Sequence, residues 1–167
     1  MKLIVWCSTF QIFRIQNPFL LNRYISRNRE MSAKYAAYGE TVKQMLLFHG
    51  TPKKEQQVLS ICETNFDWRR SGENKGQRHG QATYFSSKMT HAYHYSEPDN
   101  AGIRVMFVAK VLVGLMTMGN ISTRIPPVWK GNTRYDTTVD DLSNPTIFAK
   151  YDNNECYPAY LIEFSNK

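Results

Sequence analysis

Residues 45–51 read MLLFHGT, in which the continuous apolar run Met45–Phe48 is followed by a histidine, a glycine and a threonine. A run of this length predicts a buried strand. Chemically active side chains at the end of such a strand are well placed for a site, because the scaffold holds them rigidly. By itself, a histidine here is more often structural than ligand-binding, so His49 needs support from the rest of the chain.

The other elements follow from residue patterns. The run RVMFVAKVLVG at 104–114 predicts a central strand, since it is rich in β-branched and apolar residues. Helical spacing predicts an amphipathic helix from Phe13 to about Met31, and Ser86-Ser87 predicts the N-cap of a later one. The segment between Thr117 and Pro145 is expected to be irregular. Further helices are expected at 53–63 and 88–95, further strands at 83–85, 147–151 and 160–164, and a glycine-punctuated loop at 69–80.

Length and composition favour one folded domain. The chain has 167 residues, 42% of them apolar and 13% aromatic, which is enough to bury a single core and too apolar for a disordered chain. Because full crossover helices do not separate the strands regularly, we expect an α+β domain with a mostly antiparallel sheet. The expected domain spans 1–167, with 1–13 a ragged or truncated start.

The charge is basic and uneven. The net charge is +7, and 13 basic against 6 acidic residues precede Tyr84. Such an excess attracts nucleic acid, an anionic membrane surface or a phosphate-bearing small molecule. Nucleic-acid binding is therefore an open alternative, although the Lys and Arg residues form no long run.

The cysteines indicate a reducing compartment, and the N-terminus carries no recognisable signal peptide. Cys7, Cys62 and Cys156 form no CxxC pair and no zinc spacing. The start MKLIVWCSTF is too short for a signal peptide, so we interpret it as an edge strand or a ragged start. No window is long and apolar enough to span a bilayer. We expect an intracellular protein, in the nucleus, the cytoplasm or both, with no membrane partner.

Two sets of residues suggest a metal but are better explained otherwise. His91 and His94 lie three residues apart near His79, yet no cysteine or carboxylate pattern completes a zinc site. Asp140-Asp141 is more typical of a solvated loop. We therefore expect no metal.

Literal motifs are more specific than these patterns. The blocks LLFHGT at 46–51, HGQATYFSS at 79–87, MFVAKVLVG at 106–114 and NPTIFAKYD at 144–152 occur in order with several others, from RIQNPFLLNRY at 14–24 to YPAYLIEF at 157–164. Across nearly its whole length the chain resembles the catalytic domain of the poly(ADP-ribose) polymerase family, the diphtheria-toxin-like ADP-ribosyltransferases. It is most similar to the subgroup of mono-ADP-ribosyltransferases.

The resemblance implies an α+β ADP-ribosyltransferase fold, with split, mostly antiparallel sheets and short helices around an NAD cleft. It implies that His49 hydrogen-bonds the adenosine ribose and that the backbone of Gly50 binds the nicotinamide carboxamide. It further implies that Tyr84 and Tyr95 stack on the nicotinamide ring. It also implies that the loop at 69–80, the donor loop, covers NAD. The positions implied to bind NAD are His49, Gly50, Thr51, Arg69, Gly80, Tyr84, Phe85, Ala92 and Tyr95, with Arg70, Lys75 and Arg78 able to join Arg69 at the pyrophosphate.

Three positions depart from the family pattern. Ile147 stands where polymer-forming members have a glutamate, so the resemblance implies transfer of a single ADP-ribose to an acceptor protein, the chain itself included, with His49, Tyr84 and Ile147 at the catalytic positions. Ala92 replaces the usual serine, which weakens the hold on NAD by one hydrogen bond, about 0.5–1.5 kcal/mol. Ala82 would be strained if its position requires a positive φ. No helical regulatory domain precedes the resembling region, so we expect no activation by DNA breaks.

Three functions therefore stay open at the level of sequence. The first is an NAD-dependent mono-ADP-ribosyltransferase. The second is a catalytically silent module of the same fold that binds NAD or ADP-ribose, which Ala82 and Ala92 favour. The third is a basic nucleic-acid-binding protein built on this fold.

Overall fold

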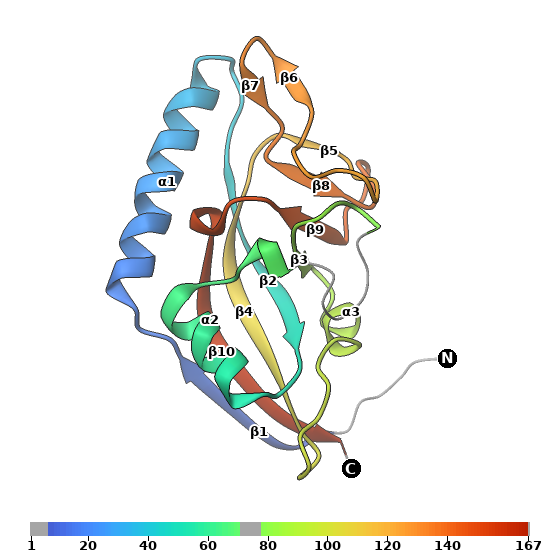
Figure 1. The fold of residues 1–167 in the computed structure, drawn as a ribbon. Coiled ribbons are helices and arrows are strands. Elements are labelled where there is room, and N and C mark those ends of the chain that lie inside the picture. The colour runs from blue at the N-terminus through green and yellow to red at the C-terminus, as the bar shows by residue number, and fades with distance from the viewer. Residues whose placement is uncertain (1–6, 71–77, 167) are drawn as a thin grey trace.

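The computed structural model describes residues 7–70 and 78–166, and it is an α+β domain as expected (Figure 1). Helices pack on both faces of one large sheet, and a small hairpin projects at one end. The helices are α1 Pro18–Ala36, α2 Glu55–Thr64 and α3 Met89–Tyr93, with short 3-10 turns η1 Trp68–Arg70 and η2 Asn153–Glu155. The strands are β1 Cys7–Arg14, β2 Lys43–Thr51, β3 Thr83–Ser86, β4 Ile103–Val113, β5 Met116–Met118, β6 Val128–Lys130, β7 Thr133–Arg134, β8 Thr137–Val139, β9 Ile147–Lys150 and β10 Cys156–Asn166.

The large sheet is nearly divided in two. Its strand order is β1-β10-β4-β2-β3-β9-β8-β5, and every neighbouring pair is antiparallel except β5 with β8. Strands β2 and β3 share a single residue pair, Phe48 with Ser86. The sheet therefore consists of two four-stranded halves joined at one point, and this division is the split expected from the resemblance.

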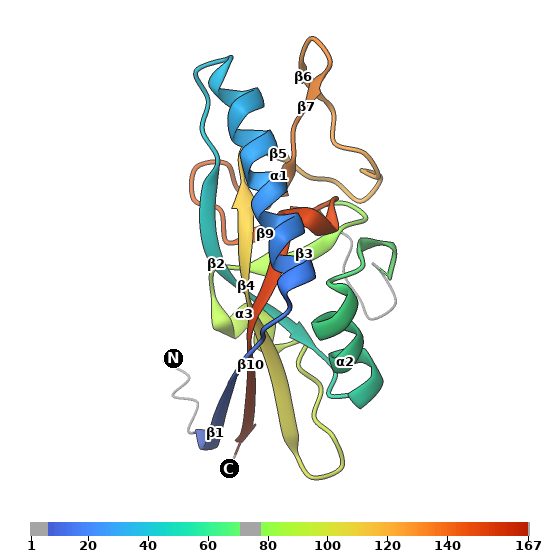
Figure 2. The ribbon, with the colours of Figure 1, turned by 90° about the vertical axis from the view of Figure 1, so that its left-hand side faces the viewer.

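Strand β4 forms the centre of the core. Val105, Phe107, Ala109 and Val111 are fully buried along one face and pack with Ile61 of α2. Alternate residues of the same strand face the other side, where Met106 packs with α3 and β10. Figure 2 accordingly shows α2 and α3 on opposite sides of β4. The expected central strand at 104–114 is confirmed.

Helix α1 begins later than its periodicity predicts. Phe13 pairs with Leu161 as part of the edge strand β1, so the expected helical start at Phe13 is wrong. Asn17 is the N-cap, because its side-chain oxygen accepts the backbone N–H of Leu20 at 3.1 Å, and Pro18 follows in the first turn. The interpretation of the N-terminus as an edge strand is confirmed for 7–14, and 1–6 lie outside the described residues.

Other boundaries also differ from the expectation. Strand β2 begins at Lys43, two residues before the apolar run, and its expected end at His49-Gly50-Thr51 is confirmed. The N-cap of α3 is Lys88, not the Ser86-Ser87 pair, although the Ser86 hydroxyl does accept the backbone N–H of Lys88 at 3.0 Å. The stretch between 117 and 145, expected to be irregular, contains β6, β7 and β8. Within the described residues, no helix combines the length and hydropathy needed to cross a membrane.

A buried cluster of charged side chains ties α1 to the second half of the sheet. Lys150 is 1% exposed, and its ammonium nitrogen lies 2.8 Å from Asp136 Oδ1 and 2.7 Å from Glu155 Oε2. Glu155 also accepts from Arg27 of α1 at 2.7 Å, and Asp136 accepts from the Tyr35 hydroxyl at 2.7 Å. Each buried charge therefore has an opposite partner and hydrogen bonds.

The three buried groups shift one another's pKa. Burial alone would lower the pKa of Lys150, but Asp136 and Glu155 outweigh it and the pKa lies above its ordinary value. Burial would raise the pKa of Asp136, yet the Lys150 ammonium and its hydrogen bonds hold it below the usual range. Burial raises the pKa of Glu155, and the carboxylate of Asp136 adds to that effect. The cluster holds a lysine cation that stays charged when buried.

Candidate active site

A cavity of about 570 Å³ opens where β2 and β3 diverge from their single shared pair. The ends of both strands line it, and α2 and α3 close its two sides. Of the residues predicted to hold NAD, this cavity brings together His49, Gly50, Thr51, Tyr84, Phe85, Ala92 and Tyr95, with Ile147, Arg70 and Arg78. The divided sheet thus gathers residues from five separate parts of the chain.

His49 has one ring nitrogen fixed by the other strand. Its Nδ1 lies 2.8 Å from the carbonyl oxygen of Tyr84, so Nδ1 carries the proton and donates. The ring also packs edge-on against Phe66, with the centroids 4.9 Å apart. Nε2 has no hydrogen-bond partner among the described residues and is not among the buried polar atoms left unpaired. Its lone pair is therefore free to accept a hydrogen bond from a hydroxyl group in the cavity.

The His49 ring is neutral. Burial lowers the pKa of His49 below its ordinary value, and the hydrogen bond to Tyr84 offsets this effect only in part. A neutral ring with its proton on Nδ1 presents an acceptor at Nε2. Such an acceptor can receive a hydrogen bond from a hydroxyl group.

This lowered pKa gives a testable dependence of stability on pH. The unfolded chain takes up the proton at the ordinary pKa of about 6.5, above the folded value. The contribution of His49 to the free energy of unfolding is therefore complete above about pH 6.5 and declines as pH falls. Urea denaturation between pH 7.5 and 5.5 should show a smaller loss of stability for His49→Gln than for the wild type. The exposed His94→Gln control should behave as the wild type, and an unchanged slope in His49→Gln would contradict the assignment.

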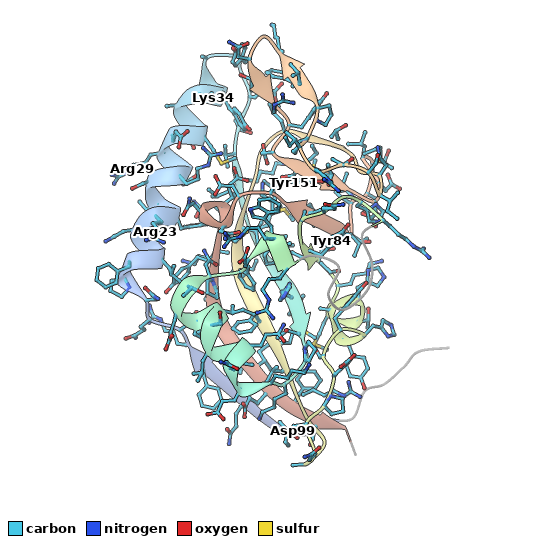
Figure 3. All side chains as sticks on the ribbon, in the orientation of Figure 1. Arg23, Arg29, Lys34, Tyr84, Asp99 and Tyr151 are labelled. Atoms are coloured by element: carbon cyan, nitrogen blue, oxygen red, sulfur yellow. The ribbon has the colours of Figure 1, made fainter. Side chains whose placement is uncertain are left out.

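Tyr84 is held by two hydrogen bonds on its hydroxyl. The hydroxyl donates to the Gly80 carbonyl oxygen at 2.6 Å and accepts the backbone N–H of His79 at 2.9 Å. Burial raises the pKa of Tyr84 to about 12. Figure 3 shows Tyr84 near Tyr151, whose hydroxyl donates to the carbonyl oxygen of His79 at 3.2 Å. Tyr84 stays un-ionised and presents its ring, not its hydroxyl, to the cavity.

Gly50 lies against the backbone of α3. A Cβ atom added there would sit 1.8 Å from the Ala92 carbonyl oxygen and 2.9 Å from the Ser96 hydroxyl. Next to it, the Thr51 hydroxyl oxygen is buried and has no partner among the described residues. Glycine at position 50 therefore lets α3 pack directly on β2, a contact that we call the Gly50 cradle, and one unpaired polar atom, the Thr51 hydroxyl oxygen, lies beside it.

Three other predicted positions lie in the same cavity. Tyr95 is 45% exposed, and it lines the cavity together with Tyr84. Ile147 begins β9 opposite Ser86, and its backbone N–H donates to Asp140 at 2.9 Å. Phe85 is buried and packs its ring near His49. The side chain at the glutamate position is therefore apolar and faces the cavity.

Two predicted NAD contacts lie outside the cavity lining. The Arg69 guanidinium is bound to the Asp67 carboxylate through two hydrogen bonds, at 2.8 and 2.9 Å, and is 72% exposed. Gly80 has a φ of +121°, and its carbonyl oxygen accepts the hydrogen bond from the Tyr84 hydroxyl. Of the cations predicted for the pyrophosphate, Arg70 and Arg78 line the cavity. Lys75 lies outside the described residues.

The strain expected at Ala82 is absent. Among described residues other than glycine, Asn65 alone has a positive φ, of 79°. Gly80 carries the unusual conformation instead, and a Cβ there would meet the Tyr151 hydroxyl at 2.1 Å. Ala82 is 2% exposed and lines the cavity without backbone strain. The alanine therefore gives no reason to expect a misshapen donor loop.

Sequence reasoning missed the support behind His49. Asn65 ends α2, and its side-chain amide donates to the carbonyl oxygens of Asn153 and Cys156 at 2.7 and 2.8 Å. This fixes Phe66 against the His49 ring. An asparagine just after a helical run is a signal for a residue of positive φ at the helix end. Asn65, just after the expected helix at 53–63, gives this signal in the sequence.

The basic excess lies partly away from the cavity. Arg23, Arg29 and Lys34 are exposed along α1, at the opposite side of the view from α3 (Figure 3). Within 7–70 and 78–166, no three His, Cys, Asp or Glu side chains gather as metal ligands. The functional features of the cavity are a neutral histidine, aromatic rings and arginines.

Fold and site together define an α+β domain with a nucleotide-sized cleft between the halves of a split sheet. The model of the poly(ADP-ribose) polymerase catalytic domain matches residues 5–127, and the chain belongs to this family.

Named relatives carry the same domain. The protein mono-ADP-ribosyltransferase PARP12 of Mus musculus is 38% identical over 157 residues, covering 93% of this chain and 21% of that protein. The protein mono-ADP-ribosyltransferase PARP14 of Homo sapiens is 34% identical, covering 95% and 9%. PARP11 of Mus musculus, with the same activity in its name, is 31% identical, covering 92% and 51%. The chain thus spans about a fifth or less of the length of the first two.

Proposed function

We propose that this protein transfers a single ADP-ribose from NAD to a side chain of an acceptor protein and releases nicotinamide. The carrying observation is Ile147, which lines the cavity at the start of β9 and has no polar side-chain atom. A side chain without an acceptor or base cannot activate a ribose hydroxyl for chain growth. The names of the relatives, all mono-ADP-ribosyltransferases, support the same reading.

The residues of the cavity supply binding and orientation. His49 accepts a hydroxyl of the adenosine ribose through Nε2, the Gly50 backbone holds the carboxamide, and Tyr84 with Tyr95 encloses the nicotinamide ring. Stacking of this kind adds about 0.5–1.5 kcal/mol per aromatic pair beyond burial. Arg70 and Arg78 offer charge-assisted donors to the pyrophosphate.

Chemistry then depends on electrostatics and position. Breaking the bond to nicotinamide builds positive charge on the ribose, which a well-oriented acceptor carboxylate or thiolate stabilises and attacks. The acceptor supplies this group itself, because Ile147 supplies none. No metal takes part in this proposal.

The test is release of nicotinamide by the purified protein in the presence of labelled NAD, with label followed onto protein. We expect label on protein and nicotinamide release, both lost in His49→Ala. NAD binding without release would instead identify a silent binding module. Salt-sensitive binding of RNA or DNA without NAD affinity would favour the nucleic-acid alternative.

A further inference from the structure

His91 is a titratable residue in the cavity to which nothing above gives a role. It lies on α3 and lines the cavity with Ser86, Ile147 and Tyr95. Its Nδ1 is buried and makes no hydrogen bond with any described residue. A buried polar atom without a partner in a native site calls for an explanation, because such atoms are uncommon.

The unpaired Nδ1 fixes the form of the ring. A buried N–H without an acceptor is costlier and rarer than an unpaired acceptor. When the ring carries a single proton, that proton therefore sits on Nε2. Nε2 is not among the buried unpaired atoms and has no partner among the described residues. His91 thus presents one free N–H donor, whereas His49 presents a free acceptor.

His91 and Ile147 line the same cavity, and a short series of backbone and hydroxyl contacts connects them. Ser86 pairs with Ile147 across β3 and β9, and its hydroxyl accepts the backbone N–H of Lys88. The backbone N–H of His91 then donates to the Lys88 carbonyl oxygen at 3.1 Å, which closes the first turn of α3. Lys88 therefore contacts Ser86 of the Ser86–Ile147 pair, and His91 follows Lys88 by one helical turn.

Other polar groups beside Ile147 are already committed. The Ser86 hydroxyl donates to the Thr146 carbonyl oxygen at 2.9 Å as well as accepting from Lys88. The Ile147 backbone N–H is bound to Asp140, and the Tyr84 hydroxyl to Gly80. A ligand hydroxyl that enters the cavity therefore finds a donor at His91 Nε2.

We propose that His91 binds the ribose next to nicotinamide, with Nε2–H donating to a ribose hydroxyl oxygen. This inference rests on the proposed function and names the residue that positions the reacting ribose in the absence of a glutamate at 147. A single N–H donor suits one hydroxyl oxygen, while the charged pyrophosphate is left to the arginines.

The test compares NAD with nicotinamide alone as titrants in calorimetry, on the wild type, His91→Phe and His91→Gln. One lost neutral hydrogen bond corresponds to about a 2- to 13-fold rise in the Kd for NAD. We expect this rise in His91→Phe, with nicotinamide bound as in the wild type. Glutamine carries an N–H donor at a similar reach, so His91→Gln should recover most of the affinity. The exposed His94→Phe control should leave both Kd values unchanged.

The outcomes separate this inference from the function on which it rests. If the wild type binds and transfers but His91→Phe binds NAD equally well, the role of His91 is overturned and the transferase function stands. If His91→Phe loses nicotinamide as much as NAD, or if glutamine does not rescue, His91 only supports α3. A wild type that binds no NAD overturns both.

Discussion

Replacing Lys150 with alanine is expected to lower the free energy of unfolding by about 3–5 kcal/mol, because it leaves buried carboxylates without their shared cation. Asp136 and Glu155 are 8% and 2% exposed, and both bind the Lys150 ammonium within 2.8 Å. Arg27 still reaches Glu155, but among the described residues Asp136 keeps only neutral hydrogen-bond donors. Urea denaturation at neutral pH measures the loss.

The direction of its pH dependence distinguishes this cause from simple loss of packing. Without Lys150, the pKa of the buried Glu155, already raised by burial and by Asp136, rises further. The folded variant then binds more protons than the unfolded chain at mildly acidic pH, so the deficit relative to wild type should shrink as pH falls toward the ordinary carboxyl pKa. Exposed Lys110→Ala, on β4, should stay within about 0.5 kcal/mol of wild type. A Lys150→Ala deficit under about 1 kcal/mol would show that the cluster does not stabilise the fold.

Gly50→Ala is expected to reduce ADP-ribose transfer by about 100-fold or more, since displacing groups at a reacting centre by about 1 Å has effects of that size. The added Cβ would lie 1.8 Å from a backbone oxygen of α3, so α3 must move away from β2. That movement shifts Ala92 and His91 together. NAD affinity by calorimetry should fall with the transfer rate.

The control for this variant is Gly102→Ala, in the turn that precedes β4. Gly102 has a φ of +76° and nothing within 4 Å of an added Cβ. Alanine there is strained by about 1–2 kcal/mol but lies outside the cavity lining, so transfer per folded molecule should be retained. A folded Gly50→Ala that transfers within about threefold of wild type would contradict the assigned role of the Gly50 cradle.

Much of the site was predictable because it rests on short literal motifs. The run ending in His49 and the strand with Tyr84 are each continuous in sequence, and the resemblance places Ile147 beside them. The structure adds the reason they meet, which is the single pair Phe48–Ser86 that lets β2 and β3 diverge. A single residue pair between two strands produces no periodic pattern in the sequence.

The remaining features depend on long-range pairing. Phe13 fits a helical period, but its pairing with Leu161 places it in β1. Strands of two or three residues, such as β7 and β8, are too short to show alternation. Lys150 follows an apolar run and looks like an ordinary surface lysine, because Asp136 is 14 residues away in sequence. The unpaired Nδ1 of His91 is visible only once α3 is packed.

The most direct test of single transfer is intact-mass analysis of the purified protein after incubation with NAD, alongside His49→Ala and Tyr84→Ala. We predict one ADP-ribose unit at each modified site and none in either variant. Ladders of units on one site would contradict the role given to Ile147, and no addition by a wild type that binds NAD would contradict transferase activity itself.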